Sequence, residues 1–530
     1  MVSSLAVGVA ACGSKARNLS TADARTLNRG NGAEPDTIDP HKASGNWENN
    51  IVGDMFIGLM TDAPDAGAMP GAAESYTVSP DGLVYIFKLR DHVWSDGKKV
   101  TAHDFVFSYR RMADPKTAAQ YVSILYPMKN MQEAASGKAR PDQVGARAID
   151  DRTLELTFNY QVPYIREMLT HYTTFAVPQH VVEKYGEDWT NAAHIVGNGP
   201  YQLREWQSND HIHLVKNPRF FDAANVAIEH VYFYPTADSA AALKRFRAGE
   251  FDLVTDSVPP QQINWLKQSM PESLHLSPYI LSNYVQFNLH RKPFDDARVR
   301  LAMSLALNRE IICEKVMRAG EQPSYVLVPP GMPGYRSAEL TFRKSSMAAR
   351  VARARALLAE AGHGPDNPVS FVLNTSNATE SRQLSVALQA MWKDIGIYAR
   401  MEHYDSAVHY DMLRKRDFDV TLAGWIADYR DPKNYLMLFE SQTADLNYGG
   451  YANPAYDSVV AASDNERDPA ARAVLLRKAE QVLLDDVVVA PVYLGVVRNL
   501  VSPQVKGFVD NNVNIHRSRY IALDRAVRSV

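Results

Sequence analysis

The segment from Gly424 to Arg430, directly before Asp431 and Pro432, holds the residues best suited to bind a charged group. Asp428 stands among aromatic residues and has no Lys or Arg at helical spacing. A partly buried carboxylate that lacks a cationic partner costs roughly a few kcal/mol, so a cation should complete it. We therefore expect Asp428 to bind an ammonium group of a ligand.

The neighbouring Asp431 has a structural explanation. It precedes Pro432 and an apolar run with helical periodicity from Tyr435 to Phe439. This pattern predicts that Asp431 caps the N-terminus of a helix whose first position is proline. Only Asp428 is then left for a ligand.

The sequence lacks the common signatures of catalysis. It has no Gly-x-Ser-x-Gly elbow, no His-Glu-x-x-His zinc motif, no Cys-x-x-Cys pair and no Gly-x-x-x-x-Gly-Lys-Ser/Thr phosphate loop. His211 and His213 share one face of a predicted strand, a spacing that suits a metal, but we interpret the pair as unrelated to metal binding. We expect a binding protein with no metal, no cofactor and no enzymatic activity.

Alternating strands and helices lead up to Asp428. Strict alternation predicts a parallel sheet covered on both faces. Ligands of such sheets bind beyond the carboxyl ends of the strands, and the segment from Gly424 to Asp428 begins where the last strand ends, which places it in a cleft. The predicted order is strand 369–375, helix 380–395, strand 397–402, helix 406–415 and strand 418–424.

Other regions predict further units and a hinge. A helix is expected from about Trp47 to Met60, and the region 67–181 looks like an α+β unit in which Thr101 and Asp104 cap a helix. A strand near 487–497 and a returning tail would give two or three crossings between lobes. A second βαβ unit comprises strands 211–216, 228–234 and 251–254 with helix 239–248.

Length, charge and hydropathy limit the possible classes. At 530 residues the chain is too long for one hydrophobic core. A formal net charge of -3 with scattered Lys and Arg argues against a nucleic-acid partner. No later segment approaches the roughly 18 uninterrupted apolar residues of a transmembrane helix. Cys313 lies in an apolar helical run and is predicted to be a buried thiol.

The only other cysteine, Cys12, suggests a lipid anchor. It ends a stretch of small and apolar residues, and Val9-Ala10-Ala11-Cys12 resembles the lipobox at which bacterial lipoproteins are cleaved and acylated. We expect residues 1–24 to be a signal or lipoprotein leader with a linker, and Cys12 to be lipidated. A plain secretory signal or a disordered leader is the alternative.

Several motifs together resemble one protein family. They occur in Ile38 to Lys42, Asp81 to Phe105, Asn198 to Tyr201, Phe294 to Arg300, Gly424 to Tyr429 and Pro491 to Tyr493. In order and spacing the chain after residue 25 resembles the periplasmic oligopeptide-binding proteins, the large solute-binding subunits of peptide ABC transporters (extracellular solute-binding protein family 5).

The resemblance implies an α/β fold with two lobes, the periplasmic-binding-protein fold of type II (cluster C). It also implies an additional inserted α+β subdomain and a hinge between the lobes. We expect lobe I to comprise residues 25–56, 181–280 and 497–530, the inserted subdomain residues 57–180, and lobe II residues 281–496.

In that family the acid of the Trp-x-Ala-Asp-Tyr motif binds the α-ammonium of a peptide, which implies this role for Asp428. The backbone before this acid and a second segment in lobe I would flank the peptide as added strands, which makes recognition indifferent to side chains. The expected ligand-binding residues are Asp428, Trp425, Gly424, Ile426, Ser44, Gly45, Asn46 and Gln286.

The chain departs from well-known members at several positions. They carry a glutamate at the position of Gln286, an arginine that helps hold the far end of the peptide at Leu422, and a tyrosine at Gly495. Their cysteine pair would fall at Leu281 and Ile426, where we expect an apolar contact to replace the bridge.

The resemblance implies a substrate-binding component that captures peptides between its lobes and delivers them to a membrane permease with its ATPase subunits. We expect a periplasmic monomer that meets the membrane only through a lipid on Cys12. One alternative is the same scaffold binding a non-peptide solute or a specialised peptide, such as a murein peptide or a dipeptide. Another is an exported hydrolase, which has only the cleft in its favour.

Overall fold

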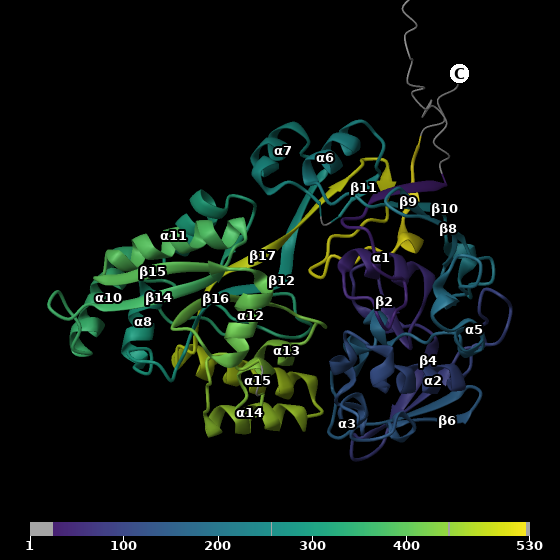
Figure 1. Ribbon diagram of the computed structural model, residues 1–530, viewed down its shortest axis with the longest axis horizontal. Helices are drawn as coiled ribbons and strands as arrows, with labels where there is room; N and C mark the ends of the chain where they lie inside the picture. The colour runs from purple at the N-terminus through teal and green to yellow at the C-terminus, as the bar shows by residue number, and fades with distance from the viewer. Residues whose placement is uncertain (1–24, 256, 444–445, 526–530) are drawn as a thin grey trace, which may run out of the picture.

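One mixed β-sheet runs through both halves of the molecule and joins them (Figure 1). The computed structural model describes residues 25–255, 257–443 and 446–525, so the predicted leader and Cys12 lie outside the described residues. The sheet has 11 strands, and its main path runs β15-β14-β16-β12-β17-β11-β1-β10-β9-β8. The two ends of this path belong to different lobes, as the predicted two-lobed α/β fold requires.

The two longest strands cross from one lobe to the other. β12 (Leu274–Phe287) has 14 residues and β17 (Val489–Val501) has 13. They pair antiparallel with each other, while β12 also pairs with β16 and β17 with β11. Their mutual register shifts between Pro278 and Ser282, an irregularity of the kind that bends a sheet. The link between the lobes is therefore a pair of strands rather than a loose linker.

Lobe II contains the predicted alternation of strands and helices. β14 is parallel to both β15 and β16, as predicted, but β16 is antiparallel to β12, so the sheet is mixed rather than purely parallel. β16 also continues two residues beyond the predicted end, to Ile426. The elements are β14 (Val369–Ser376), α11 (Thr379–Lys393), β15 (Ile397–Tyr404), α12 (Ser406–Lys415) and β16 (Val420–Ile426).

Lobe I holds the other end of the sheet. The predicted βαβ unit is present, but its strands β10 and β11 are not neighbours, because β1 lies between them and is parallel to both. A strand from the start of the chain thus completes a unit formed much later in sequence. The elements are β1 (Thr26–Gly30), β8 (Tyr201–Gln207), β9 (His211–Lys216), β10 (His230–Tyr234), α6 (Ser239–Arg247) and β11 (Leu253–Val254).

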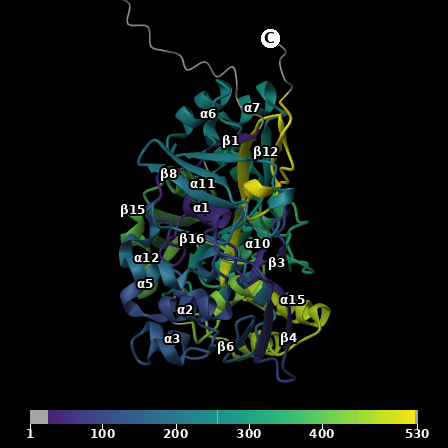
Figure 2. The same ribbon diagram turned by 90° about the vertical axis from the view of Figure 1, so that its right-hand side faces the viewer.

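The inserted region has its own four-stranded antiparallel sheet in the order β4-β5-β7-β6. Helix α2 (Ala102–Ala113) begins as predicted, since Asp104 accepts a hydrogen bond of 2.8 Å from the N–H of Thr101. α2, α3 and β6 lie at the end of the molecule opposite α6 and α7 (Figures 1 and 2). The strands are β4 (Ala73–Val78), β5 (Val84–Leu89), β6 (Ala146–Asp150) and β7 (Thr153–Thr157).

The remaining elements complete the two lobes. Helix α1 (Asn46–Met55) is shorter than predicted, because the chain turns extended at Phe56 before β2 (Met60–Asp62). No helix among the described residues is both long and apolar enough to span a membrane. The others are β3 (Ala68–Pro70), α3 (Met131–Ala135), α4 (Ile165–Met168), α5 (Gln179–Tyr185), α7 (Ile263–Ser269), α8 (Ala297–Leu305), α9 (Arg309–Ile311), β13 (Gln322–Pro323), α10 (Met347–Glu360), α13 (Lys433–Leu436), α14 (Pro454–Asp464), α15 (Pro469–Asp485), β18 (Val505–Lys506) and β19 (Ala522–Leu523).

Separate hydrophobic cores stabilise the two lobes. One core, from Leu27 to Ile521, joins lobe I to the inserted region and also includes Tyr429 of lobe II, and a second core occupies lobe II from Ile280 to Tyr493. A smaller core lies beneath α6 and α7. Cys313 is buried in the lobe II core, as predicted, and burial raises the pKa of its thiol to about 12.

The carboxylate of Glu480, on α15, fastens the loop after β13 to lobe II. It is fully buried and accepts hydrogen bonds from the N–H groups of Leu327 (3.0 Å), Val328 (2.8 Å) and Ala338 (2.7 Å) and from the hydroxyl of Tyr335 (2.6 Å). Burial raises the pKa of Glu480 to about 7, against the lowering effect of these donors. One side chain thus orders a loop that has little secondary structure of its own.

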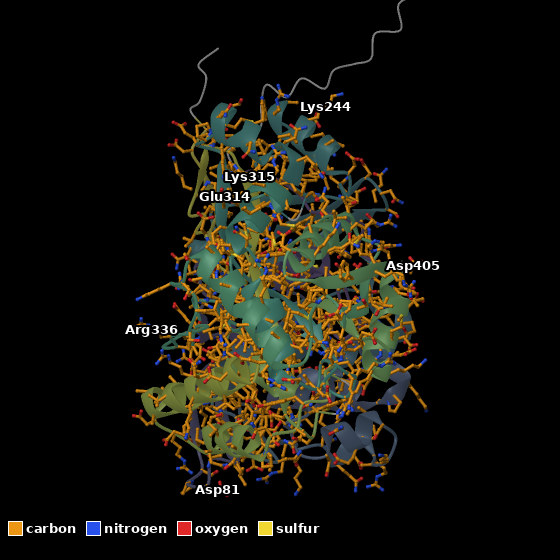
Figure 3. The ribbon with its side chains drawn as sticks, turned by 90° about the vertical axis from the view of Figure 1, so that its left-hand side faces the viewer. Asp81, Lys244, Glu314, Lys315, Arg336 and Asp405 are labelled. Carbon is orange, nitrogen blue, oxygen red and sulfur yellow. The ribbon has the colours of Figure 1, made fainter. Side chains whose placement is uncertain are left out.

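Replacing this side chain tests its contribution to stability. Glu480→Ala leaves four donors without their acceptor, so we expect the free energy of unfolding to fall by about 3 kcal/mol. Glu314→Ala is the control, since Glu314 is an exposed acid of the same lobe (Figure 3), and its effect should stay within about 0.5 kcal/mol. Denaturant titration measures both variants, and equal losses would contradict this role for Glu480.

Candidate functional site

Asn434 holds the residues of the Asp428 segment in place. Its side-chain oxygen accepts hydrogen bonds from Nε1 of Trp425 (2.7 Å) and from the N–H of Asp428 (3.2 Å). Its amide nitrogen lies 3.4 Å from Oδ2 of Asp428 and donates to it. Asn434 is fully buried on α13, so this one amide holds both the indole and the carboxylate. The sequence pattern gave no sign of this residue.

The carboxylate of Asp428 has no cationic partner. Within the described parts of the chain, no Lys, Arg or His lies within ion-pair distance of it, and the amide of Asn434 is its neutral donor. Burial raises the pKa of Asp428 above the ordinary value of 3.8, and the hydrogen bond from Asn434 opposes this only in part. The expectation that this acid lacks a local counter-charge is confirmed.

Asp431 has a different environment, and its predicted role is only partly correct. One carboxylate oxygen accepts a hydrogen bond of 2.9 Å from the N–H of Lys433, but the cap position is Pro432 and the helix begins at Lys433. The main partner is Arg472 on α15, which donates to both carboxylate oxygens at 2.6 and 2.8 Å. The sequence pattern missed this ion pair because Arg472 is 41 residues away.

Asp428 faces a cavity between the lobes of about 340 Å³. The opposite wall includes Ser44, Gly45 and Asn46, so the structure brings together two segments that the sequence separates by almost 400 residues. A Cβ on Gly45 would lie only 2.5 Å from the ring of Trp47, which explains the glycine. The N–H groups of Ser44 and Gly45 both donate to Glu48, so further contacts from this segment must use its carbonyls and side chains.

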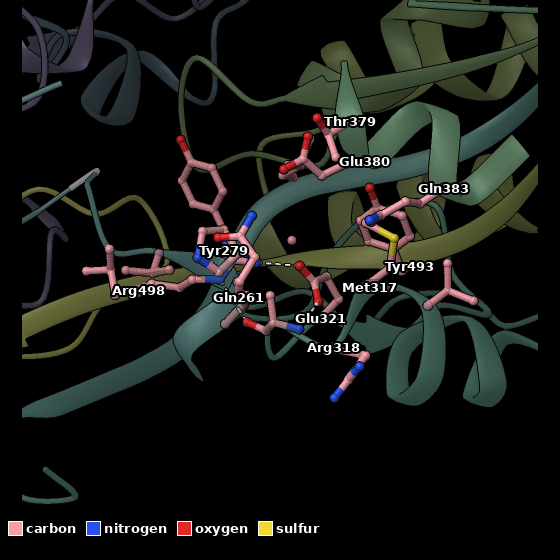
Figure 4. Close-up of a pocket in the computed structure, with 18 of the residues that line it drawn as sticks. Gln261, Tyr279, Met317, Arg318, Glu321, Thr379, Glu380, Gln383, Tyr493 and Arg498 are labelled. Carbon is pink, nitrogen blue, oxygen red and sulfur yellow. Dashed lines mark hydrogen bonds and ion pairs between the residues drawn. The ribbon is translucent and has the colours of Figure 1, made fainter. Parts of the chain in front are cut away.

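A larger cavity of about 1090 Å³ continues from the first toward the crossing strands (Figure 4). Asn46, Tyr279 and Ile426 line both cavities, so the two form one cleft. In the larger part Arg498 is already paired with Glu321, and Arg318 points away from the other labelled side chains (Figure 4). Further residues that face this space are Gln261, Met317, Thr379, Glu380, Gln383 and Tyr493.

Comparison with known proteins identifies the scaffold. The family description "Bacterial extracellular solute-binding proteins, family 5 Middle" matches residues 67–447. The chain is 37% identical over 491 residues to the periplasmic oligopeptide-binding protein OppA of Salmonella typhimurium, which covers 92% of this chain and 90% of the relative. The chain belongs to family 5 of the bacterial extracellular solute-binding proteins. The predicted resemblance and fold class are confirmed.

Solved structures of this family define the arrangement of the lobes. The unliganded open form of the murein tripeptide-binding protein MppA has a TM-score of 0.86 at 32% identity, covering 94% of this chain and 97% of that chain. Haemophilus influenzae OppA in complex with the peptide RPPGFSPFR scores 0.76 at 33% identity, with 94% and 99% covered. Identity and coverage are nearly equal, so this family 5 protein is more similar in its lobe arrangement to the unliganded open form than to the peptide complex.

The predicted backbone segment lies within β16, on an edge that is partly open. Gly424, Trp425 and Ile426 pair with β12 on one side. On the other side β14 pairs with β16 only at Val420 and Thr421 within the described chain. Ile426 lines both cavities. Gly424 and Trp425 are not among the described residues that line either cavity. An extended ligand could add to this edge, with Trp425 orienting Asn434 rather than contacting the ligand.

Gln286 is placed away from the cleft, which corrects its predicted role as a ligand contact. It is buried within β12, and its amide donates to the carbonyls of Phe287 (2.9 Å) and Val488 (3.3 Å). Strand alternation turns its side chain into lobe II, and the hydrogen bonds hold it there. The sequence alone could not decide which face of β12 meets the cleft.

Two other positions at which the chain differs from well-known family members, the Leu281–Ile426 pair and Gly495, lie close together where the strands cross between the lobes. Leu281 and Ile426 are direct register partners in β12 and β16, so the two apolar residues stand opposite each other as expected. A Cβ on Gly495 would lie 2.8 Å from the side chain of Leu281. All three residues line the larger cavity, so small or aliphatic residues keep this part of the cleft wide.

The two neighbouring acids should respond oppositely to neutralisation. The pKa of Asp428 is raised on folding, so its stabilising contribution is present below the ordinary value of 3.8 and is lost as the pH rises through the raised pKa. Asp428→Asn should therefore raise the stability of the ligand-free protein at pH 7. Asp431→Asn should lower it by about 3 kcal/mol, because Arg472 would be left buried and unpaired.

Denaturant unfolding at pH 7 and at pH 4 measures both effects. The gain from Asp428→Asn should shrink at pH 4, where the wild-type carboxylate takes up its proton. A loss of stability in both variants at pH 7 would show that Asp428 is an ordinary structural acid.

Proposed function

We propose that this protein is the substrate-binding component of a peptide ABC transporter, which captures peptides between its lobes and delivers them to a membrane permease. The observation that carries the proposal is the half-buried carboxylate of Asp428 in the cleft, which forms no ion pair with any described residue. A peptide α-ammonium supplies the missing charge, and its hydrogen bonds would replace water lost on closure. The family name of OppA, an oligopeptide-binding protein, supports the same ligand class.

The surroundings of Asp428 suit the backbone of a peptide. The open edge of β16 offers main-chain groups to an added strand, a mode that accepts many side chains. Nε1 of Trp47 is a buried donor on the opposite wall, and it has no hydrogen-bond acceptor among the described residues. A peptide carbonyl close to the ammonium would satisfy it. Donor and acceptor thus line the same cavity.

Removing the carboxylate tests the proposal directly. Asp428→Ala should weaken the binding of tetra-alanine with a free N-terminus by about 100-fold or more, since a desolvated charge pair is lost. N-acetylated tetra-alanine should bind weakly to both proteins, because it carries no ammonium. Calorimetry measures the affinities, with thermal unfolding to check the fold. Unchanged affinity of the variant for the free peptide would refute the role of Asp428.

Peptide affinity should depend on pH through the same group. The ammonium binds the ionised carboxylate, whereas burial favours the protonated form in the ligand-free protein. Below the raised pKa, affinity should fall by about tenfold for each pH unit. Calorimetry between pH 7 and pH 4 follows this change, and Asp428→Asn should abolish it. A flat profile in the wild-type protein would contradict the model of ion pairing.

The proposal extends to location and assembly. OppA proteins of Salmonella typhimurium and Escherichia coli are named periplasmic proteins, which supports a periplasmic location. We include in the proposal that the protein is a monomer that works with permease and ATPase subunits. We include a lipid on Cys12 as its attachment to the membrane. The intact mass of the mature protein tests this, since a lipid-sized addition should be absent from Cys12→Ser.

A specialised peptide is the second candidate ligand. A relative named as a murein peptide-binding protein, MppA of Escherichia coli at 33% identity over 495 residues, supports it. Native mass spectrometry of protein purified without denaturation separates the candidates: a ladder of co-purified peptides supports general peptide capture, and a single cell-wall peptide mass supports the second. A bound mass that is not a peptide would refute both.

A further inference from the structure

A second carboxylate, that of Glu167, faces the cavity of Asp428. Glu167 lies on α4 of the inserted region and is half-buried. It lines the Asp428 cavity and also a neighbouring cavity of about 490 Å³ between the inserted region and α15. Its side chain therefore lies in the wall that separates these two cavities, where the inserted region is next to lobe II.

Ring stacking fixes α4 against the Asp428 segment. Tyr164, just before α4, stacks on Tyr429 with ring centroids 4.8 Å apart and planes 5° apart. The guanidinium of Arg472 lies 5.8 Å from the ring of Tyr164 on the same side of the cleft. Glu167 follows Tyr164 by three residues and Asp428 precedes Tyr429 by one, so the contact holds both acids at one site although they belong to different lobes.

The carboxylate of Glu167 forms no ion pair among the described residues, and its one hydrogen-bond donor is the backbone N–H of Glu167 itself. Burial raises its pKa, as does the charge of Asp431, while Arg166 and Arg430 lower it only in part. Both arginines are engaged elsewhere. Arg166 donates to the carbonyl of Ala68 at 2.7 Å, and Arg430 donates to the carbonyls of Asp65 and Gly331 at 3.2 and 3.3 Å.

Arg430 lines the same cavity and acts on Glu167 from a distance, but none of the described ionisable groups of the cavity forms a direct ion pair with Glu167. Asp62 is neutralised by Arg517, at 2.8 Å. His171 is neutral near pH 7, since burial and the charge of Arg517 lower its pKa to about 3. A peptide ammonium at Asp428 would therefore leave the carboxylate of Glu167 for a second cation.

The walls beside Glu167 suit the stem of a long cationic side chain. The ring of His171 stacks on Tyr172 with centroids 4.5 Å apart and lies 5.5 Å from Tyr121. Lys and Arg pack their methylene groups on such rings while the charged end reaches a carboxylate. This combination of flat walls and an unpaired acid distinguishes the site from an exposed acidic surface.

We propose that Glu167 binds the cationic side chain of the first residue of the peptide, so that this protein prefers ligands that begin with Lys or Arg. The inference rests on the proposed peptide function. It adds a side-chain preference to a site whose main-chain contacts are otherwise indifferent to sequence.

Two matched tetrapeptides test the preference. Lys-Ala-Ala-Ala and norleucine-Ala-Ala-Ala share the α-ammonium and nearly the same side-chain length, and differ in the terminal cation. We expect the wild-type protein to bind the lysine peptide about fivefold to tenfold more tightly, the range of a partly desolvated charge pair. Glu167→Gln should bind both peptides with equal affinity, and Glu167→Asp should keep part of the difference.

Glu133→Gln is the control, because Glu133 is an exposed acid of the same inserted region that lines none of these cavities; it should keep the full preference. Equal binding of the two peptides to the wild-type protein, or an unchanged preference in Glu167→Gln, would overturn the inference. Binding of neither peptide to the wild-type protein would instead refute the proposed peptide function. Calorimetry distinguishes these outcomes, and thermal unfolding verifies that each variant is folded.

Discussion

The carboxylate of Asp428 is half-buried in the cleft, and no described residue forms an ion pair with it. The amide of Asn434 orients it, but a neutral donor does not offset the loss of water around a full charge. The protein keeps this unfavourable group at the boundary of two lobes, where a ligand cation can reach it. Under the proposed function, a bound cation would offset the desolvation cost of this carboxylate. Because Asn434 already orients the carboxylate, little conformational entropy would be lost on binding.

The two long strands β12 and β17 link the lobes on either side of the cleft. β12 and β17 form one continuous sheet across the lobes, so the lobes are linked by backbone hydrogen bonds and by a local irregularity near Pro278. A ligand that touches Asp428 on lobe II and the segment around Asn46 on lobe I contacts both moving bodies at once. Under the proposed function, such a ligand would favour closure of the lobes wherever closure strengthens its contacts with both.

The two parts of the cleft differ in character. Near Asp428 the walls are close, aromatic and acidic, whereas toward the strand crossing the space is about three times larger, at about 1090 against 340 Å³. In the larger part Arg498 is already neutralised by Glu321, and Gly495 contributes no side chain. One end of a ligand would therefore be recognised by fixed groups, and the other would lie in a roomy space where water can mediate contacts.

The sequence by itself determined the local structure and the unusual acid. The alternation in 369–424 predicted its strands and helices, because hydrophobic periodicity and end signals act over a few residues. The absence of a nearby cation marked Asp428, and ordered motifs indicated the family. These features depend only on neighbours along the chain. The partial error at Asp431 has the same origin, since a local cap signal hid an ion pair with a residue on another helix.

Only the tertiary structure decided which distant segments meet. It inserted β1 between β10 and β11, made β16 antiparallel to β12 and turned Gln286 into the core. It also supplied Asn434 as the support of Asp428 and set Glu167 beside it through the stacking of Tyr164 on Tyr429. Strand order and side-chain facing are fixed by the packing of whole elements, which the spacing of residues along one element does not encode.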